Sequence, residues 1–408
     1  MKKGESIALV SLGCAKNAVD LQVRAGALLK RGAVLSPNPD RADTVIVNTC
    51  AFIASAREEA EAEIRRALEL KRRGQYARVV VTGCYPQRYP KAVAAFPGVD
   101  EWIGVPQTWQ EPPMPALRLT GKAFAYLKIA EGCAHRCAYC AIPAIRGKYR
   151  SRPLASIMRE AKALLATGCR ELNVVAQDPM LWREGEKTLT DLLWRLDKLP
   201  GDFWVRVLYS YPSEITEDFV IWLATARHAV RYVDVPLQHT VPEVLAKMNR
   251  KPAIEASRAA AEVLREVVPG VTLRTTIMTG FPGETEARFH RLLADLRRMQ
   301  FDHLGAFAYS PEVGTKGAKL GGRPSRAVAE AREREVMAQQ AKIWRYQAKR
   351  LLGSVHRALV VAPGVARMAS QAPDVDGVVH VDCDAVGEFI SVRLVKVRGF
   401  DFIGEVVA

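Results

Sequence analysis

Short apolar runs rich in β-branched residues alternate with longer helix-like stretches along the first hundred residues. The runs are of strand length and lie at Ile7–Ser11, Thr44–Asn48 and Arg78–Thr82. Strands that alternate with helices form parallel sheets, because a crossover helix is needed to bring successive strands into the same direction. The pattern therefore predicts an open parallel-sheet α/β domain at the N-terminus.

The helix after the second run carries signals at both ends. Ser55 can cap its first turn, and Glu58, three residues on, completes a capping-box pattern. Gly74 follows the basic stretch Lys71-Arg72-Arg73, which is typical of a helix end. We therefore predict a helix that is capped at Ser55 and ends before Gly74.

A second region of β/α alternation follows a proline-rich break at Glu111–Pro115, which is a linker signal. Its six β/α units occupy about 190 residues, whereas the eight units of a TIM barrel usually take ~250. We therefore predict an incomplete (β/α)6 barrel of the TIM type. The candidate strands are Ala125–Ala130, Glu171–Ala176, Trp204–Tyr209, Tyr232–Val235, Thr272–Met278 and His303–Tyr309.

The last part of the chain changes pattern again. A basic, helix-like stretch at Ala327–Leu352 leads out of the predicted barrel, and Ser354–Ala408 alternates apolar and polar residues between Gly and Asp turns. This alternation is typical of a small all-β domain. The predicted domains are therefore residues 1–110, 119–340 and 341–408.

The composition of the chain is that of a globular protein. Its 408 residues are 49% hydrophobic and 25% charged, which excludes disorder for most of the length. No apolar run approaches the roughly 18 residues needed to span a bilayer, so we expect a cytoplasmic protein without a membrane partner. The net charge of +15 suits a phosphate-rich partner, but a solvated basic surface fits it too, so charge alone does not choose.

The eight cysteines fall into two groups of three and two isolated residues. Groups of three do not suit pairwise disulfides, and grouped cysteines in a large cytosolic chain more often bind metal or do redox chemistry. Small isolated cysteines are ordinary core residues. The groups are Cys14, Cys50 and Cys84, then Cys133, Cys137 and Cys140, whereas Cys169 and Cys383 stand apart.

The second group has the spacing C-x3-C-x2-C just past the first barrel strand, where TIM-type barrels place their active sites. Three thiolates leave one iron of a [4Fe-4S] cluster open for another ligand. A zinc site would need a fourth ligand, and His135 has an unusual spacing for that role. The loop, with Tyr139 before its last cysteine, resembles that of the radical S-adenosylmethionine (SAM) enzymes. The resemblance implies that Cys133, Cys137 and Cys140 bind a cluster whose open iron chelates SAM.

The first group of cysteines shares a position relative to the predicted strands. Cys14, Cys50 and Cys84 each lie just beyond one of three successive strands. Because ligands of open α/β sheets bind outside the carboxyl ends of the strands, these thiols are expected to converge at one edge. Gly13 and Gly83 permit close backbone approach to a bulky group. We therefore predict a second [4Fe-4S] cluster, again with an open iron.

Two cysteine triads followed by a small β domain resemble the methylthiotransferases over essentially the whole chain. The resemblance implies an N-terminal cluster domain, a radical SAM barrel and a C-terminal TRAM domain. Four stretches are similar to the RimO branch, which modifies an aspartate of the twelfth small-subunit ribosomal protein; the alternative is the branch that modifies an adenosine in transfer RNA. The stretches are Ser11–Asp20, Ile129–Cys137, Val235–His239 and Ala372–Gly377.

The RimO resemblance implies methylthiolation of the aspartate β-carbon. One SAM methylates sulfur held at the first cluster, and a second yields a radical at the second cluster. The implied partners are the ribosomal protein, free or within the small subunit, an electron donor such as a flavodoxin or ferredoxin, and ribosomal RNA as a further contact. A different class also remains open, namely an RNA-binding or assembly protein whose clusters are structural.

The predicted C-terminal domain differs in charge from the rest of the chain. From Gly353 to Ala408 it has five basic and seven acidic residues, whereas a domain that grips RNA is normally basic. An acidic surface complements a basic ribosomal protein. We therefore take Asp374 and Asp376 as candidate substrate-recognition residues.

Further candidates for contact with SAM lie near the carboxyl ends of the predicted barrel strands. Thr279–Thr285 (T-G-F-P-G-E-T) resembles the superfamily segment that approaches the adenine, although a plain Pro/Gly turn before a helix would look the same. The candidate cofactor contacts are Tyr139, Gln177, Arg206, Gln238, Gly280 and Gly283.

Overall fold

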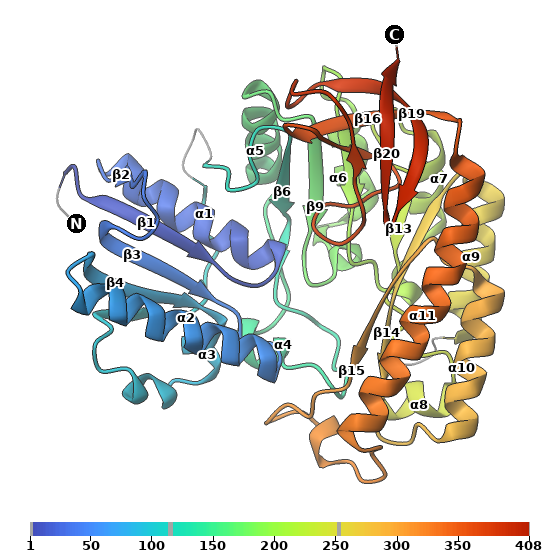
Figure 1. The fold of residues 1–408 in the computed structure, drawn as a ribbon, viewed down its shortest axis with the longest axis horizontal. Helices are drawn as coiled ribbons and strands as arrows, with labels where there is room; N and C mark the ends of the chain where they lie inside the picture. The colour runs from blue at the N-terminus through green and yellow to red at the C-terminus, as the bar shows by residue number, and fades with distance from the viewer. Residues whose placement is uncertain (1–2, 113–116, 251–253, 408) are drawn as a thin grey trace. The chain divides into compact units, whose positions relative to one another are not determined.

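The computed structural model describes residues 3–112, 117–250 and 254–407, and Figure 1 traces their elements. The elements belong to two units, which are described separately. Unit 1 comprises residues 1–119, 126–136 and 140–163, and unit 2 comprises residues 120–125, 137–139 and 164–408. Residues 113–116, which make up most of the predicted proline-rich break, lie outside the described residues.

Unit 1 is built on a five-stranded parallel sheet in the order β2-β1-β3-β4-β5 (Figure 1). The three predicted strands are confirmed as β1 (Ser6–Ser11), β3 (Ala42–Thr49) and β4 (Tyr76–Gly83). The sheet gains two short edge strands, β2 (Val34–Leu35) and β5 (Glu101–Ile103). The strand order reverses between β1 and β3, and in such sheets the ligand site lies at this switch point.

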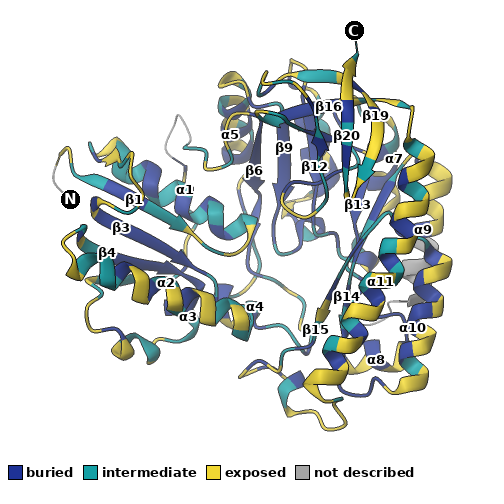
Figure 2. Cartoon of the chain, viewed as in Figure 1, coloured by how far each residue is buried: buried dark blue, intermediate teal, exposed yellow. Residues whose placement is uncertain are grey.

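Helices pack on both faces of this sheet because successive strand residues point to opposite sides. Val45 and Val47 of β3 pack in one cluster with Ala60 of helix α2 (Ala54–Arg72). Ile46, between them, packs with Leu21 of α1 (Ala15–Lys30) on the other face. Figure 2 shows β3 and β4 buried almost throughout, as expected of strands covered on both sides.

The predicted capping of α2 at Ser55 is wrong. The helix begins at Ala54 after the extended residue Ile53, and no side chain caps it. Its start is therefore set by the loop that leaves β3 rather than by a hydroxyl cap. The predicted end is confirmed, because Arg73 is the C-cap residue and Gly74, directly after it, adopts a left-handed conformation with φ 72°.

The remaining elements of unit 1 are one short helix that follows β4 and several elements around the second cysteine group. β7 pairs with β8 in an antiparallel ribbon. These elements are α3 (Cys84–Arg88), β7 (Ala130–Glu131), α4 (Ile142–Arg146), β8 (Arg150–Ser151) and most of α5 (Leu154–Ala166).

The six predicted barrel strands are all present, each within two residues of its predicted ends. They form two parallel three-stranded sheets, β12-β9-β6 and β13-β14-β15. Within unit 2, an isolated parallel bridge pairs Val205 of β12 with Ala229, which lies three residues before β13 in the chain. The strands are β6 (Phe124–Lys128), β9 (Glu171–Val175), β12 (Trp204–Val207), β13 (Tyr232–Asp234), β14 (Thr272–Thr279) and β15 (His303–Ala308).

Helices and a short hairpin connect these strands in unit 2. Helix α11 (Arg326–Leu351) confirms the predicted basic helix, and the predicted domain boundary at residue 341 falls inside it. No helix of the described residues is long and apolar enough to cross a bilayer. The other elements are β10 (Arg183–Glu184), β11 (Lys187–Thr188), α6 (Leu189–Asp197), α7 (Glu217–Thr225), α8 (Pro242–Lys247), α9 (Ile254–Val267) and α10 (Glu286–Met299).

A closed five-stranded barrel in the order β16-β17-β18-β20-β19 ends unit 2. Trp344 of α11 joins its apolar core, with its ring 5.4 Å from that of Phe402. The predicted small all-β domain is therefore confirmed. Its strands are β16 (Val355–Ala362), β17 (Val365–Met368), β18 (Val379–His380), β19 (Phe389–Arg398) and β20 (Asp401–Val407).

Candidate active site: two cysteine triads

The first three cysteines follow three neighbouring parallel strands of unit 1. Cys14 follows β1 and caps α1, Cys50 follows β3, and Cys84 opens α3 directly after β4. Because β1, β3 and β4 are adjacent and parallel, their carboxyl ends meet at one edge of the sheet. Cys14 is exposed, Cys50 is half-buried and Cys84 is buried.

The three thiols lie close enough to influence one another's ionisation. Burial raises the pKa of Cys84 to about 12, with Arg146 opposing and Cys50 and Cys14 adding to the rise. Burial and the charge of Cys14 also raise the pKa of Cys50. At Cys14, partial desolvation alone would raise the pKa, but Lys16 and Arg146 bring it below its ordinary value. The triad thus runs from a thiol whose pKa lies below its ordinary value to one whose pKa is raised to about 12.

Glycines let the loops that carry these thiols approach one another. Gly13 has φ 93°, and a Cβ there would lie 2.8 Å from the Cβ of Cys50. Gly83 has φ 101°, and a Cβ there would lie 2.6 Å from the carbonyl oxygen of Thr49. Only glycine fits at either position.

The three thiols of this triad suit the ligand set of a cluster with one open iron. Among the described residues, no three Cys, His, Asp or Glu side chains converge on one metal-ion position. In a [4Fe-4S] cluster each thiolate binds a different iron, so the thiolates need not meet at a point. Three thiols around one sheet edge therefore fit a cluster with one open iron.

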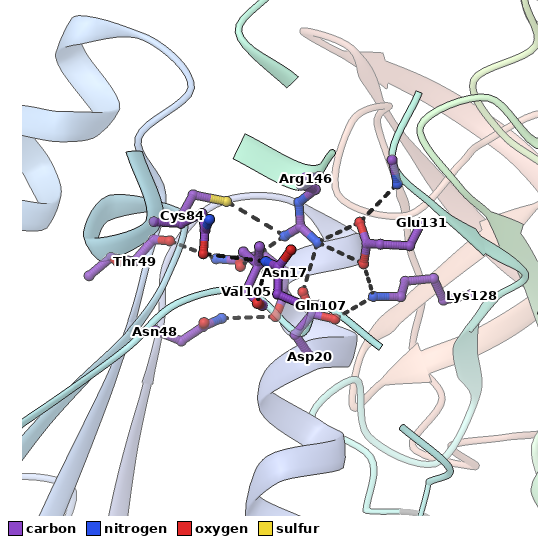
Figure 3. A network of polar contacts seen from close by, with 12 residues as sticks. Asn17, Asp20, Asn48, Thr49, Cys84, Val105, Gln107, Lys128, Glu131 and Arg146 are labelled. Carbon is purple, nitrogen blue, oxygen red and sulfur yellow. Dashed lines mark hydrogen bonds and ion pairs between the residues drawn. The ribbon is translucent and has the colours of Figure 1, made fainter. Parts of the chain in front are cut away.

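A buried ionic network borders the first triad (Figure 3). Arg146 donates from Nη1 to Asp20 Oδ2 at 2.8 Å and to Glu131 Oε1 at 3.0 Å, and Lys128 pairs with the same two carboxylates. Arg146 also donates from Nη2 to the Sγ of Cys84 at 3.5 Å. Burial opposes ionisation of Glu131, but Lys128 and Arg146 together hold its pKa below the ordinary value. Two cations and two carboxylates therefore balance one another beside a thiol.

The second triad lies in a stretch shared by the two units. In unit 1, the amide of Cys133 donates to Gly147 O at 3.4 Å, and the Sγ of Cys140 accepts from the amide of Ile142 at 3.5 Å. Gly132 precedes this triad with φ 76°, and a Cβ there would lie 2.2 Å from the carbonyl oxygen of Lys148. The residue before the first thiol must therefore be glycine, as in the first triad.

In unit 2, Cys137 and Tyr139 share one cationic partner. Arg250 donates from Nη1 to the Sγ of Cys137 at 3.7 Å and to the hydroxyl of Tyr139 at 3.2 Å. The Tyr139 ring also packs edge to face on Phe281, at 6.4 Å between centroids. Phe281 belongs to the T-G-F-P-G-E-T segment, so unit 2 brings two of the predicted cofactor regions together.

The segments that follow three successive strands of unit 2 each contain a residue with a left-handed backbone. Tyr209 follows β12 with φ 70°, Gln238 follows β13 with φ 69°, and Gly280 follows β14 with φ 74°. Such conformations are strained for residues other than glycine and cluster at functional sites. Gln177, half-buried, lies two residues beyond the end of β9. Gln177, Gln238 and Gly280 thus all lie in segments that follow the carboxyl ends of strands.

Local geometry accounts for the two predicted glycines as well. A Cβ at Gly280 would lie 2.2 Å from the Cβ of Ala329 in α11, and one at Gly283 would lie 2.7 Å from the Nζ of Lys247. Gly280 is therefore required by its neighbour in α11, and Gly283 is favoured by its backbone at φ 94°, whether or not a ligand approaches.

Arg206 lies elsewhere than predicted. Its side chain is fully buried and reaches back to Glu171, the first residue of β9, with Nε 2.8 Å from Oε1. Its Nη1 donates to Ala369 O at 2.8 Å. These contacts are at the amino end of β9, so the guanidinium joins the sheet to the C-terminal barrel instead of facing the site.

The two predicted recognition aspartates also differ from each other. Asp374 is exposed, in a loop where its φ is 66°. The carboxylate of Asp376 is only 2% exposed and accepts from the hydroxyl of Tyr232 at 2.7 Å and from the amide of Ala372 at 2.9 Å. The side chain of Asp376 is thus committed within unit 2, whereas Asp374 is an exposed residue.

Comparison with known proteins agrees with this arrangement of parts. The model of the radical SAM superfamily matches residues 127–296, that of an uncharacterized protein family, UPF0004, matches residues 6–104, and that of the TRAM domain matches residues 358–407. Ribosomal protein uS12 methylthiotransferase RimO of Moorella thermoacetica is 40% identical over 430 residues, which are 98% of this chain and 99% of that protein. Its counterpart from Syntrophus aciditrophicus is 39% identical over 99% of this chain and 98% of its own length.

The chain belongs to the RimO family. As a RimO family member it is a radical SAM methylthiotransferase, and membership of the superfamily implies one [4Fe-4S] cluster and SAM. The transfer-RNA alternative is not favoured, because the relatives at 39–40% identity bear the uS12 name.

Solved structures show the same fold at low sequence identity. The radical SAM methyltransferase TsrM from Kitasatospora setae, solved with cobalamin and a [4Fe-4S] cluster, has a TM-score of 0.57 at 19% identity and covers 76% of this chain and 77% of its own. OxsB, a cobalamin-dependent radical SAM enzyme, has a TM-score of 0.53 at 12% identity. The match covers 83% of this chain and 58% of the OxsB chain. The likeness concerns the fold alone.

Sequence analysis missed several residues that touch the triads of this RimO family chain. For Arg146 a signal existed, because it is a lone charge after the apolar run Ile142–Ile145, close to the second cysteine group. Arg250 had no such signal. Cys169, buried with its Sγ 3.3 Å from Glu171 O, and Cys383, packed against the core of the C-terminal barrel, have the ordinary packing roles expected.

Proposed function

We propose that this chain attaches a methylthio group to the β-carbon of an aspartate in ribosomal protein uS12, with SAM as both methyl donor and radical source. The observation that carries the proposal is the occurrence of two cysteine triads, one of them at the carboxyl ends of three adjacent parallel strands. Cys133, Cys137 and Cys140 hold the SAM-cleaving cluster. Cys14, Cys50 and Cys84 would hold a second [4Fe-4S] cluster, which would supply the site for methylation of sulfur.

The chemistry needs a cofactor, because a β-hydrogen is too weakly acidic for a side-chain base to remove. A cluster with bound SAM supplies a 5′-deoxyadenosyl radical for this step. The protein's own part is positioning. Three thiolates in each set leave one iron open, so each cluster can take a further ligand without losing its attachment.

Residues at the carboxyl ends of the strands orient SAM. Gln177, Gln238 and Gly280 follow β9, β13 and β14, and Tyr139 packs on Phe281 in the same unit. The left-handed backbone at Gln238 is a strain of the kind found at ligand sites. We therefore assign these residues to cofactor binding, and we do not assign Arg206 to it.

The substrate and the other partners follow from the relatives and from charge. The relatives act, by name, on uS12, and an exposed carboxylate at Asp374 suits a basic ribosomal protein. The substrate is the free protein or the protein within the small subunit, in which case ribosomal RNA is a further partner. A flavodoxin or ferredoxin supplies electrons, and the reaction takes place in the cytoplasm.

Anaerobic reconstitution with iron and sulfide tests the proposal. Under reduction with SAM and uS12, the parent protein should make 5′-deoxyadenosine and methylthiolated uS12. Cys133→Ala should lose both products, because two thiolates do not hold a cluster with one open iron. The triple variant Cys14→Ala, Cys50→Ala, Cys84→Ala should keep 5′-deoxyadenosine formation but lose the methylthio product. Methylthiolated uS12 from the triple variant would show that the first triad is structural.

A further inference from the structure

One buried guanidinium touches the first triad. Arg146 is only 1% exposed, and its Nη2 donates both to the Sγ of Cys84 at 3.5 Å and to the Oδ1 of Asn17 at 3.2 Å (Figure 3). Arginine keeps its charge at any physiological pH. A hydrogen bond from a charged donor to a sulfur stabilises negative charge on that sulfur more than a neutral donor does.

Asn17 extends the reach of Arg146 to the other two thiol-bearing loops. Its amide nitrogen donates to Leu12 O at 2.8 Å and to Thr49 O at 3.1 Å, so its amide oxygen must face the guanidinium. Leu12 lies two residues before Cys14, and Thr49 directly precedes Cys50. Arg146 thus binds one triad sulfur directly and fixes the loops of the other two through a single side chain.

Carboxylates hold Arg146 in this orientation. Its Nη1 is taken by Asp20 and Glu131, and Lys128 balances their second negative charge. With Nη1 occupied, Nη2 is left to serve Asn17 and Cys84. The position of the donor is therefore fixed before any cluster binds.

An independent guanidinium touches the second group of cysteines, in unit 2. Arg250 is 4% exposed and donates from Nη1 to the Sγ of Cys137 at 3.7 Å. Its Nη2 donates to Pro236 O at 2.6 Å, and its guanidinium lies 4.2 Å from the centre of the Tyr211 ring. The carbonyl and the ring fix this arginine, as the carboxylates fix Arg146.

We propose that Arg146 and Arg250 are positioning residues, each dedicated to one triad, and that each raises the reduction potential of the cluster bound at its own triad. The half that concerns Arg146 rests on the proposed second cluster. Hydrogen bonds to ligand sulfurs and nearby positive charge stabilise the reduced, more negative state of a cluster, and thereby raise its potential. Two separate donors allow two clusters in one chain to be set to different potentials.

The test uses full-length protein that carries one cluster at a time. Replacing Cys133, Cys137 and Cys140 with Ala leaves the first triad alone, and replacing Cys14, Cys50 and Cys84 with Ala leaves the second. Arg146→Gln and Arg250→Gln are made in both backgrounds. Iron and sulfide content is measured first, followed by the midpoint potential from a redox titration monitored by electron paramagnetic resonance.

Each glutamine variant is expected to change the potential of one cluster only. Arg146→Gln should shift the first cluster to a more negative potential and leave the second unchanged, and Arg250→Gln should do the reverse. The matched control is Arg152→Gln, which removes another buried arginine of unit 1 whose partners are Ser156 and Glu160 rather than a sulfur. If the loss of any buried arginine changed the potential through the structure, Arg152→Gln would also shift the potential. That result would overturn the proposal.

Lysine variants keep the test decisive if a glutamine variant does not fold. Arg146→Lys and Arg250→Lys retain the buried charge but lose the second donor nitrogen, so they should give shifts of the same sign and smaller size. Unchanged potentials with full iron content would refute the inference and leave the proposed function standing. If the protein that retains only the first triad binds no iron, the proposed second cluster is refuted instead. The Arg250 variants still test the part of the proposal that concerns the second triad.

Discussion

The Nε2 of His239 lies 3.2 Å from the Oε2 of Glu284, and both side chains are fully buried. The Nδ1 of His239 accepts the amide of Val241 at 3.0 Å, so the proton is on Nε2 and is donated to Glu284. The other carboxylate oxygen of Glu284 accepts from the amide of Gly280 at 2.9 Å and from Nη1 of Arg332 at 2.8 Å. One carboxylate therefore fixes the loops that follow β13 and β14, where we assign Gln238 and Gly280 to SAM.

Glu284→Gln is expected to disturb these two loops. Breaking a buried ion pair by removing one partner costs about 3 to 5 kcal/mol, because the other charge is left without compensation. The variant should unfold at lower temperature in a thermal scan and bind SAM more weakly in calorimetry of reconstituted protein. Glu286→Gln is the control: it also pairs with Arg332, but its side chain is 69% exposed, so both measurements should stay at parental values. Equal effects from the two variants would contradict the role given to Glu284.

Much of the fold was predictable because buried parallel strands leave a plain signal. β3 and β4 are covered on both faces and therefore appear as continuous apolar runs, and β14 and β15 alternate with helices of regular length. The edge strands β2 and β5 have two and three residues, too few for a pattern. The start of α2 was missed because its loop, and not a capping hydroxyl, sets it.

The cysteines of the site were predictable and their surroundings were not. A triad is visible because its members share a place after strands or a close spacing. Arg146 and Cys84 are 62 residues apart, and Arg250 and Cys137 are 113 apart, so only the folded chain brings them together. Arg206 and Asp376 were misplaced for the same reason, since residues distant in sequence turn both side chains inward.

The three thiols of the first triad should differ in reactivity in metal-free, reduced protein. Cys14 is exposed and its pKa lies below the ordinary value, so it should react first with iodoacetamide at pH 8. Cys84 is buried with a pKa of about 12, so only about one part in ten thousand is thiolate at that pH. Mass spectrometry over time should find Cys84 modified at least roughly 100-fold more slowly than Cys14. Lys16→Gln should slow Cys14 alone, and equal rates at Cys14 and Cys84 would contradict the ordering.

Unit 2 should lose stability in acid through Glu171. Burial alone would raise the pKa of this carboxyl, but Arg367 and Arg206 hold it below its ordinary value. Because the pKa is lower in the folded state, the stabilisation is present above the ordinary carboxyl range and is lost as pH falls toward the folded pKa. Urea unfolding between pH 7 and pH 3 should therefore show a midpoint that falls with pH, and Glu171→Gln should lower the midpoint at pH 7 and flatten this dependence. Asp202→Asn, which breaks the exposed pair with Arg357, is the control and should keep the parental dependence.

The last prediction concerns Asp374 and the docking of uS12. Neutralising it as Asp374→Asn suits the backbone, because asparagine tolerates the left-handed conformation at φ 66°. An exposed charge of this kind contributes about 0.2 to 1 kcal/mol, so affinity for uS12 should fall about 1.4- to five-fold at low salt.

The salt dependence of that defect distinguishes a docking charge from a change in the fold. The screening length shortens from about 30 Å at 0.01 M to about 8 Å at 0.15 M ionic strength, so the difference between Asp374→Asn and the parent protein should shrink over this range. The loss should lie mainly in the association rate, because charges at the rim of an interface steer the encounter more than they hold the complex. Formation of 5′-deoxyadenosine without uS12 should be unchanged, since the cysteines are untouched.

Glu388→Gln removes another exposed charge of the same barrel and should have no effect if Asp374 marks the docking surface. Parental affinity of Asp374→Asn at low salt would remove Asp374 from recognition, and an equal loss in Glu388→Gln would assign the effect to the charge of the whole domain.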